Sequence, residues 1–249
     1  MSLFNKLFIE GVRYEKERVT DDNIYPFNIP AIKNLDELKF EKPVTFLIGE
    51  NGAGKSTIIE ALAVSLRLNP EGGSQNIMFK TVDTHSNLSD YLTLYMTSNL
   101  PKTKYFLRAE SFYNVATEIQ KLAEEDENDA LYNAYGGNLH ECSHGESYIR
   151  LVKNRFNAKG LYVLDEPEAA LSPVRQMTLL CLINDLVKEG SQFIISTHSP
   201  ILLSYKNADI FDLDNDFEKV EYEDTEIVRT YKMFLDDPDR MQNKLFNSE

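Results

Sequence analysis

The sequence contains no apolar run long enough to cross a membrane, which takes about 20 residues. Its first eighteen residues, MSLFNKLFIEGVRYEKER, have neither a long apolar stretch nor a small-residue cleavage site, so they do not look like a signal peptide. Cysteine is also scarce, since Cys142 and Cys181 are the two in a chain of 249 residues. These absences predict reduced thiols and a cytoplasmic protein without a transmembrane segment.

Basic residues are also fewer than acidic ones. The chain has 26 Lys and Arg residues against 40 Asp and Glu, which gives a net charge of −14. Binding to DNA or RNA without sequence preference depends on Lys and Arg side chains that neutralise phosphates. We therefore do not expect the surface as a whole to bind nucleic acid, although a local basic patch is compatible with the sequence. Much of the acid lies at 209–226, where a solvated acidic surface is expected.

The apolar segments that are present predict an α/β fold. Runs at 44–50, 160–167 and 192–199 have the length and composition of buried strands. Segments at 56–68 and 175–190 have the apolar spacing of helices. The same patterns predict strands at 91–97 and 104–109, short edge strands at 208–213 and 219–224, and helices at 111–127 and 226–237. Buried strands that alternate with helices indicate a mostly parallel sheet covered on both faces.

The segment GENGAGKST at 49–57 fits the pattern G-x-x-x-x-G-K-[ST] of a phosphate-binding loop. Its glycines allow backbone N–H groups to wrap a phosphate, Lys55 brings a positive charge, and the Ser56 hydroxyl can bind Mg²⁺. The motif lies between a predicted strand and a predicted helix, as its mechanism requires. The residues expected to bind nucleotide are Gly49, Glu50, Asn51, Gly52, Ala53, Gly54, Lys55, Ser56 and Thr57.

Two further predicted strands end in residues that suit the same chemistry. Asp165 ends one strand, where ligands bind in open α/β sheets, and can hold Mg²⁺. Glu166 follows it and can orient and deprotonate an attacking water. His198, in STHSP at 196–200, can hydrogen-bond phosphate and that water. Taken alone, the two acids would cap a helix and the histidine would be structural; the phosphate loop favours the catalytic interpretation.

In this order and spacing the motifs resemble the ATP-binding-cassette (ABC) type of P-loop ATPase, over about 44–203. DEPEAALSP and STHSP are most similar to the soluble, stand-alone type of DNA repair, SMC-like chromosome maintenance and phage defence. EAALS at 168–172 resembles the family's D-loop, with Ser172 where Asp is usual. The resemblance implies ATP and Mg²⁺ as cofactors. It also implies a P-loop NTPase head with a mostly parallel sheet, an antiparallel β portion and a small helical lobe.

The expected organisation is one domain over 1–249. The nucleotide-binding core would span about 1–90 and 158–249, and the helical lobe, which carries the signature segment, about 110–157. Fewer than 120 residues separate the phosphate loop from Asp165, which leaves no room for the long coiled coils of the repair and condensation ATPases.

The segment ECSHGES at 141–147 has two interpretations. Counted back from Asp165, CSHGE occupies the place of the family's LSGGQ signature; Ser143 and Gly145 match it, whereas His144 and Glu146 depart. The resemblance implies that this segment reaches across a head-to-tail homodimer, formed on ATP binding, to the γ-phosphate on the partner. The alternative is a metal or cysteine-nucleophile site in HECSH at 140–144, although a fourth zinc ligand is not evident.

Two family positions are not fixed by the sequence. Glu110 or Ser111 stands where the family has a glutamine, and either can reach Mg²⁺ or water; Glu110 is the weaker metal candidate beside Ser56 and Asp165. Tyr25 and Phe27 are both placed to stack on adenine, although rings in such a stretch are more often core residues.

The work that ATP performs is open at this stage. The leading interpretation is an ATP hydrolase that acts as a dimer. The alternatives are a nucleotide-gated switch for a protein effector, such as a nuclease, or for DNA, and the ATPase subunit of a transporter.

Overall fold

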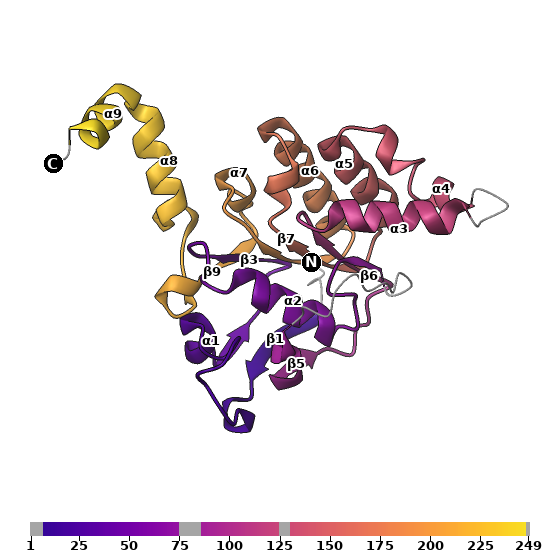
Figure 1. The fold of residues 1–249 in the computed structure, drawn as a ribbon, viewed down its shortest axis with the longest axis horizontal. Helices are drawn as coiled ribbons and strands as arrows, with labels where there is room; N and C mark the ends of the chain where they lie inside the picture. Colours follow the sequence, from indigo (N-terminus) through magenta and orange to yellow (C-terminus); the bar gives the residue numbers. More distant parts are fainter. Residues whose placement is uncertain (1–6, 75–85, 125–129, 248–249) are drawn as a thin grey trace, which may run out of the picture.

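The structure is a computed structural model that describes residues 7–74, 86–124 and 130–247 (Figure 1). The strands are β1 (Ile9–Tyr14), β2 (Glu37–Lys39), β3 (Val44–Ile48), β4 (Gly73–Ser74), β5 (Leu92–Met96), β6 (Thr103–Arg108), β7 (Gly160–Asp165), β8 (Gln192–Ser196), β9 (Ala208–Asp212) and β10 (Glu218–Lys219). The α-helices are α1 (Pro30–Asn34), α2 (Lys55–Ser65), α3 (Phe112–Glu124), α4 (Ala130–Ala134), α5 (His144–Arg155), α6 (Pro173–Lys188), α7 (Pro200–Leu203), α8 (Glu226–Asp236) and α9 (Pro238–Phe246).

The main sheet has the strand order β10-β9-β3-β8-β7-β6-β4. Its five central strands, from β9 to β6, run parallel, while β10 and β4 pair antiparallel at the two edges. Strands β3, β8 and β7 are immediate neighbours, so the segments that follow them emerge at one edge of the sheet. The predicted α/β fold with a mostly parallel sheet is confirmed.

Both faces of this sheet are covered, which explains why its central strands are apolar throughout. Phe46 and Ile195 pack on one face with residues of α3, α5 and α6, whereas Leu47 and Ile194 pack on the other with residues of α2. In Figure 1 helices α3, α5, α6 and α7 lie above the sheet, and α1, α2, β1 and β5 lie below it. The loops that follow these strands are therefore carried by a layer that is packed on both faces.

Local signals set the ends of helix α6. It begins at Pro173, where the missing N–H costs nothing because the first turn has no partner for it. It ends at Lys188, two residues before Gly190, whose φ of 87° lies in the left-handed region that glycine adopts freely.

The antiparallel part is a second sheet of order β2-β1-β5. The two strands predicted at 91–97 and 104–109 exist but belong to different sheets, since β5 pairs with β1 and β6 pairs with β7 and β4. Their burial explains the division. Tyr105, Phe106 and Leu107 are buried in succession within the main sheet, whereas no residue of β5 is fully buried.

The prediction of an edge strand at 208–213 is wrong. Strand β9 lies inside the main sheet, parallel to β3 on one side and antiparallel to β10 on the other. Ala208 to Phe211 are all buried, so this short segment has the composition of an interior strand. Of the segment predicted at 219–224, only Lys219 lies in a strand, the two-residue β10, and a 3-10 turn follows at Tyr222–Asp224.

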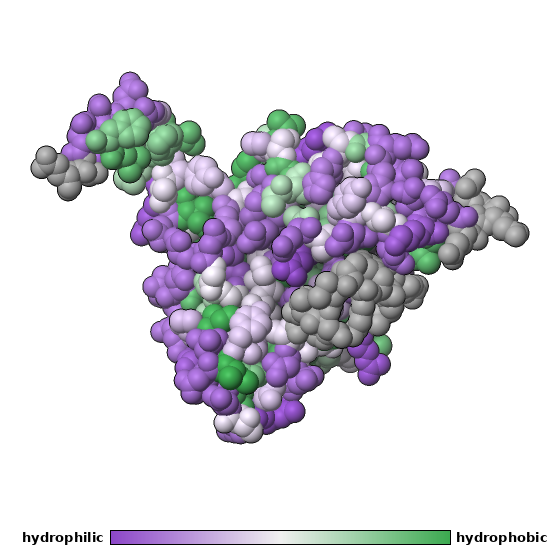
Figure 2. All heavy atoms as spheres, in the orientation of Figure 1, coloured by the Kyte–Doolittle hydropathy of each residue, from purple (hydrophilic) through white to green (hydrophobic). Residues whose placement is uncertain are grey.

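Helix α8 was predicted, and the structure adds α9 after it. Figure 1 shows both helices projecting away from the body of the molecule, and Figure 2 shows apolar residues gathered on them. Leu235, Leu245 and Phe246 are among their exposed side chains. Among the described residues, no helix combines the length and apolar character that crossing a bilayer demands.

Candidate functional site

The phosphate loop joins β3 to α2 and curls around the Lys55 side chain. Gly52 and Gly54 have φ values of 87° and 101°, which glycine adopts without the cost that other residues incur. Lys55 is buried, and its Nζ donates to the carbonyl oxygens of Gly49 and Glu50, each at 2.9 Å. Burial lowers the pKa of Lys55, and nearby carboxylates, Glu166 first among them, oppose this. The loop thus holds its ammonium group in place.

The Asp165 side chain links the end of β7 to the first turn of α2 and to the end of β8. It is buried, and its Oδ1 accepts hydrogen bonds from the Ser56 hydroxyl at 3.1 Å and from the Ser196 hydroxyl at 2.5 Å. Burial raises the pKa of Asp165, while the hydrogen bond from Ser196 and the charge of Arg108 oppose that rise. The carboxylate is consequently fixed relative to both the phosphate loop and β8.

Glu166 and His198 lie side by side after β7 and β8. Glu166 has a left-handed backbone with a φ of 45°, and its N–H donates to the Ser196 carbonyl at 3.1 Å. Its Oε1 is 3.7 Å from His198 Nε2. Burial lowers the pKa of His198, which favours the neutral imidazole at neutral pH. The two side chains are close but not hydrogen-bonded, and His198 Nε2 has no hydrogen-bond partner among the described residues.

Glu168 contacts the backbone of His198. Its Oε1 accepts a short hydrogen bond from the His198 backbone N–H, and burial raises the pKa of Glu168. The third acid of the DEPE motif therefore positions the histidine, a role that the sequence did not reveal.

The oxygen donors around Asp165 suit a magnesium ion. One pocket is lined by Ser56, Arg108, Ala109, Glu110, Asp165, Glu166 and Ala169, and we call it the Asp165 pocket. Carboxylate and hydroxyl oxygens are the ligands that Mg²⁺ takes, and the Ser56 and Asp165 oxygens are already 3.1 Å apart. Glu110 is mostly exposed and is turned to Arg108, at 3.1 Å. Ser111 is committed elsewhere, since its hydroxyl donates to the Glu71 carbonyl.

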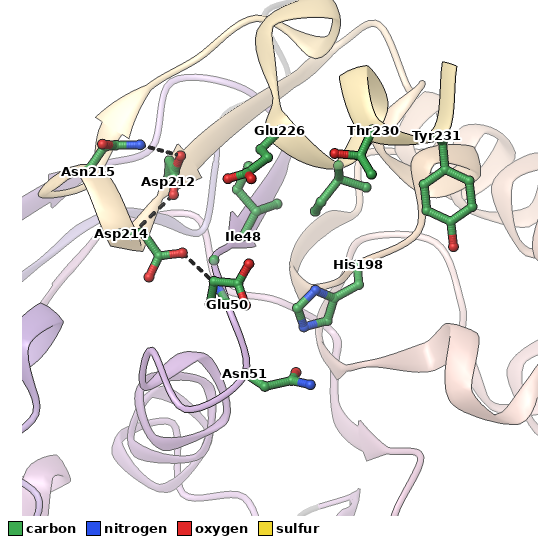
Figure 3. Close-up of a pocket in the computed structure, with 12 residues that line it drawn as sticks. Ile48, Glu50, Asn51, His198, Asp212, Asp214, Asn215, Glu226, Thr230 and Tyr231 are labelled. Carbon is green, nitrogen blue, oxygen red and sulfur yellow. Dashed lines mark hydrogen bonds between the residues drawn. The ribbon is translucent and has the colours of Figure 1, made fainter. Parts of the chain in front are cut away.

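A second cavity opens beside the phosphate loop and is shown in Figure 3. Glu50, Asn51 and His198 face it from the loop side, opposite Glu226 and Tyr231 of α8. Asp214, which sequence reasoning missed, accepts a 2.6 Å hydrogen bond from the Glu50 backbone N–H. It fixes the first turn of the loop.

The structure separates the two candidate adenine-stacking rings. Tyr25 is exposed, and its hydroxyl is 3.5 Å from Thr57 Oγ1 of the phosphate loop. Phe27 is buried, and its ring packs edge-on against Tyr91 at 4.8 Å. Tyr25 is therefore the ring available to a nucleotide base.

Ser143 and Gly145 stand apart from these groups. They share no hydrogen bond or ion pair with Lys55, Asp165 or His198 in the part of the chain that the structure describes. Ser143 is the exposed N-cap of α5; its carbonyl accepts the first helical N–H groups, and its hydroxyl makes no capping bond. Gly145 is buried. A Cβ at this position would lie 2.8 Å from the Ala170 carbonyl oxygen, so no larger residue fits without a shift.

The metal interpretation of HECSH is not supported. His140 packs against the Tyr113 ring at 4.9 Å, and His144 packs against the Phe112 ring at 5.2 Å. Within residues 7–74, 86–124 and 130–247, no three His, Cys, Asp or Glu side chains form a group that could hold a metal ion. Glu146 pairs with Arg150 one turn along the helix, at 3.5 Å.

Comparison with known proteins places the chain among ATP-binding proteins. A family model described as an AAA domain matches residues 22–229. The xylose/arabinose import ATP-binding protein XylG of Sulfolobus acidocaldarius is 30% identical over 210 residues, which cover 74% of this chain and 80% of that protein. The nucleoside import ATP-binding protein NupA of Lactococcus lactis is 26% identical over 180 residues, or 66% of this chain and 35% of its own.

The chain spans little more than a third of the length of the first of these relatives, NupA and the ribose import ATP-binding protein RbsA of Bacillus cereus. Among solved structures, the SMC head domain from Thermotoga maritima aligns with a TM-score of 0.38 and 17% identity, over 70% of this chain and 88% of that one.

Proposed function

Because the chain belongs to the AAA domain family and is an ABC-type P-loop ATPase, we propose that it binds ATP with Mg²⁺ and hydrolyses it between two copies arranged head to tail. The observation that supports this proposal is that the phosphate loop after β3 and the carboxylates after β7 meet at one edge of the sheet, where Ser56, next to Lys55, donates a hydrogen bond to Asp165. We further propose that 1–249 acts as one ATPase domain, with a core at about 1–90 and 158–249 and a signature lobe at about 110–157. A cytoplasmic location stays a prediction.

Nucleotide binding is assigned to the loop from Gly49 to Thr57. Backbone N–H groups at the start of α2 and the Lys55 ammonium favour phosphate there. The exposed Tyr25 ring beside Thr57 offers a stacking surface for adenine. When bound, Mg²⁺ neutralises phosphate charge during phosphoryl transfer. Ser56 and Asp165 would hold it, with Glu110 as a weaker candidate.

Hydrolysis is assigned to Glu166 and His198. Glu166 orients a water and accepts its proton as the water attacks. The neutral imidazole of His198 lies 3.7 Å from Glu166, and its Nε2, which bonds no described residue, offers a hydrogen bond to phosphate or to the water. Its placement depends on Glu168, whose carboxylate holds the His198 backbone.

The proposed dimer is supported by the exposed position of Ser143 at the N-terminus of α5, where its hydroxyl makes no capping bond within its own helix. A hydroxyl and a helix N-terminus suit a phosphate group. We propose that Ser143 and the Gly145 backbone N–H bind the γ-phosphate held by the partner copy.

What hydrolysis drives is a separate proposal. One candidate role is the ATPase subunit of an import system, because the relatives are import ATP-binding proteins by name. The leading alternative remains a nucleotide-gated switch for a protein effector, such as a nuclease, or for DNA. Co-purification with a membrane protein would favour the import role, whereas turnover that depends on DNA or on a soluble partner would favour the switch.

The proposal is tested by titrating ATP with Mg²⁺ into wild type and Lys55→Ala while phosphate release is measured. We expect the wild type to bind and hydrolyse ATP, and Lys55→Ala to lose binding by at least about 10-fold. Lys121→Ala, which removes an exposed Lys of α3 that pairs with Glu118, is the matched control. A wild type that neither binds ATP nor releases phosphate would contradict the proposal.

A further inference from the structure

Arg108, the last residue of β6, contacts three carboxylates from three elements. Its Nη1 is 3.1 Å from Glu60 of α2, and its Nη2 is 3.1 Å from Glu110 in the segment after β6. Its Nε is 3.3 Å from Asp165 Oδ2. The planar fork of a guanidinium can serve several acceptors at once, which an ammonium group on a flexible stem does less well.

These contacts lie largely out of solvent. The side chains of Asp165, Glu60 and Arg108 are 4%, 14% and 24% exposed, whereas Glu110 is 82% exposed. A buried carboxylate is costly unless it is paired, and Arg108 supplies the opposite charge nearest to Asp165 Oδ2.

Arg108 approaches Asp165 from the side on which the Asp165 pocket lies. Oδ1 of Asp165 is taken by the hydroxyls of Ser56 and Ser196, while Oδ2 faces Arg108. Arg108 and Ser56 both line the Asp165 pocket. The other nearby cation, Lys55, is engaged with backbone carbonyls of its own loop.

We propose that Arg108 is a built-in counter-ion at the Asp165 pocket, which supplies part of the positive charge that Mg²⁺ brings and so lets nucleotide bind measurably without a divalent cation. The inference rests on the proposed ATP function and concerns the charge balance of the same site. Arg108 acts on Asp165 and on the field around the phosphates, so it is a positioning residue rather than a catalytic one.

The physical consequence is a negative coupling between Arg108 and the metal. Two cations beside one carboxylate repel each other, so each contributes less when the other is present. If the guanidinium moves away from Asp165, it keeps its contacts with Glu60 and Glu110, and no charge is left unpaired. Removing Arg108 should therefore weaken nucleotide binding mainly when Mg²⁺ is absent.

The test measures the affinity of a fluorescent ATP analogue in EDTA and in excess Mg²⁺, for wild type, Arg108→Met and Arg108→Lys. We expect Arg108→Met to lose about 10-fold in EDTA and no more than about 2-fold with Mg²⁺. Arg108→Lys, which keeps the charge but not the fork, should fall between the two in EDTA. Lys121→Met removes an exposed charge elsewhere and should change neither affinity.

Equal losses in EDTA and in Mg²⁺, or a larger loss in Mg²⁺, would overturn the inference. If Arg108→Met does not fold because Glu60 and Asp165 lose this one of their contacts, Arg108→Met/Glu60→Gln and Arg108→Lys are compared instead, with thermal unfolding as the check on folding. A wild type that binds the analogue in neither condition contradicts the proposed function, and the inference falls with it. A wild type that binds with Mg²⁺ but not at all in EDTA contradicts the inference alone.

Discussion

The phosphate-loop edge and the segment at Ser143–Ser147 are built in opposite ways. At the loop edge, Lys55 and Asp165 are each buried and held by at least two polar partners from the same chain. At the signature segment, Ser143 is exposed with its hydroxyl uncapped. The backbone there is nonetheless firmly placed, since Gly145 approaches the Ala170 carbonyl too closely for any side chain.

On the proposed function, this difference separates a preorganised phosphate loop from a segment that acts on the nucleotide of the partner copy. Buried charges need partners and therefore carry their own network wherever they act. A polar group that acts on another molecule has to remain available, so it sits on a rigid support and makes few bonds of its own. The four predictions below test this contrast, from the largest expected effect to the smallest.

The first prediction concerns the loop edge. Glu166→Gln should reduce phosphate release by about 10³-fold, since an amide cannot accept a proton, while ATP binding stays near the wild-type value. Phosphate release and nucleotide affinity measured on the same preparation check this. Loss of both together would show that Glu166 supports the loop rather than the chemistry.

The second prediction separates chemistry from packing within the signature segment. Ser143→Ala should lower turnover by about 10²-fold and leave thermal stability unchanged, because the hydroxyl caps nothing in its own chain. Gly145→Ala should instead destabilise the fold by about 1–3 kcal/mol, because the new Cβ meets the Ala170 carbonyl oxygen at 2.8 Å. Thermal melts and turnover distinguish them. A large drop in stability for Ser143→Ala would contradict the contrast.

The third prediction compares two neighbouring rings. Tyr25→Ala should weaken ATP binding by about 10-fold through lost stacking, with little effect on stability. Phe27→Ala should lower the free energy of unfolding by about 3 kcal/mol, because the ring is buried against Tyr91. Titration and chemical denaturation check the pair. If Phe27→Leu, which keeps most of the apolar volume, weakened ATP binding more than Tyr25→Ala, the assignment would be reversed.

The fourth prediction is a small dependence of stability on pH. Burial raises the pKa of Glu168, so its charged form costs stability as pH rises from its ordinary pKa through the raised one. Glu168→Gln keeps an acceptor for the His198 N–H and should be more stable than wild type at pH 7 by about 1 kcal/mol or less. The gain should vanish near pH 4. A gain that grew at acid pH would have the wrong sign.

The motifs at strand ends were predictable from sequence because each is local. Gly54 and Lys55 follow a strand and open a helix, and Asp165 ends an apolar run, so spacing alone indicated their setting. The signature segment was found by its distance from Asp165 rather than by its own composition. Its composition also allowed a metal or cysteine-nucleophile site as a lesser alternative, which the packing of His140 and His144 on separate rings does not support.

The features that sequence could not provide depend on long-range contacts. Strand β9 was expected at an edge, and only its pairing with β3, more than 150 residues away, places it in the interior. Ser196 and Arg108 reach Asp165 from two neighbouring strands. Nothing local to either residue signals that contact, because the order of strands in the sheet decides it.

The central claim is that one copy supplies the phosphate loop and another supplies Ser143. It is tested most directly by mixing two inactive variants, Lys55→Ala and Ser143→Arg, and measuring phosphate release. A mixed dimer contains one site with both Lys55 and Ser143 intact, so the account predicts that turnover reappears on mixing and rises with the proportion of mixed dimer. Turnover that stays at the level of the separate variants, although a mixed dimer is detected by mass, would contradict the account.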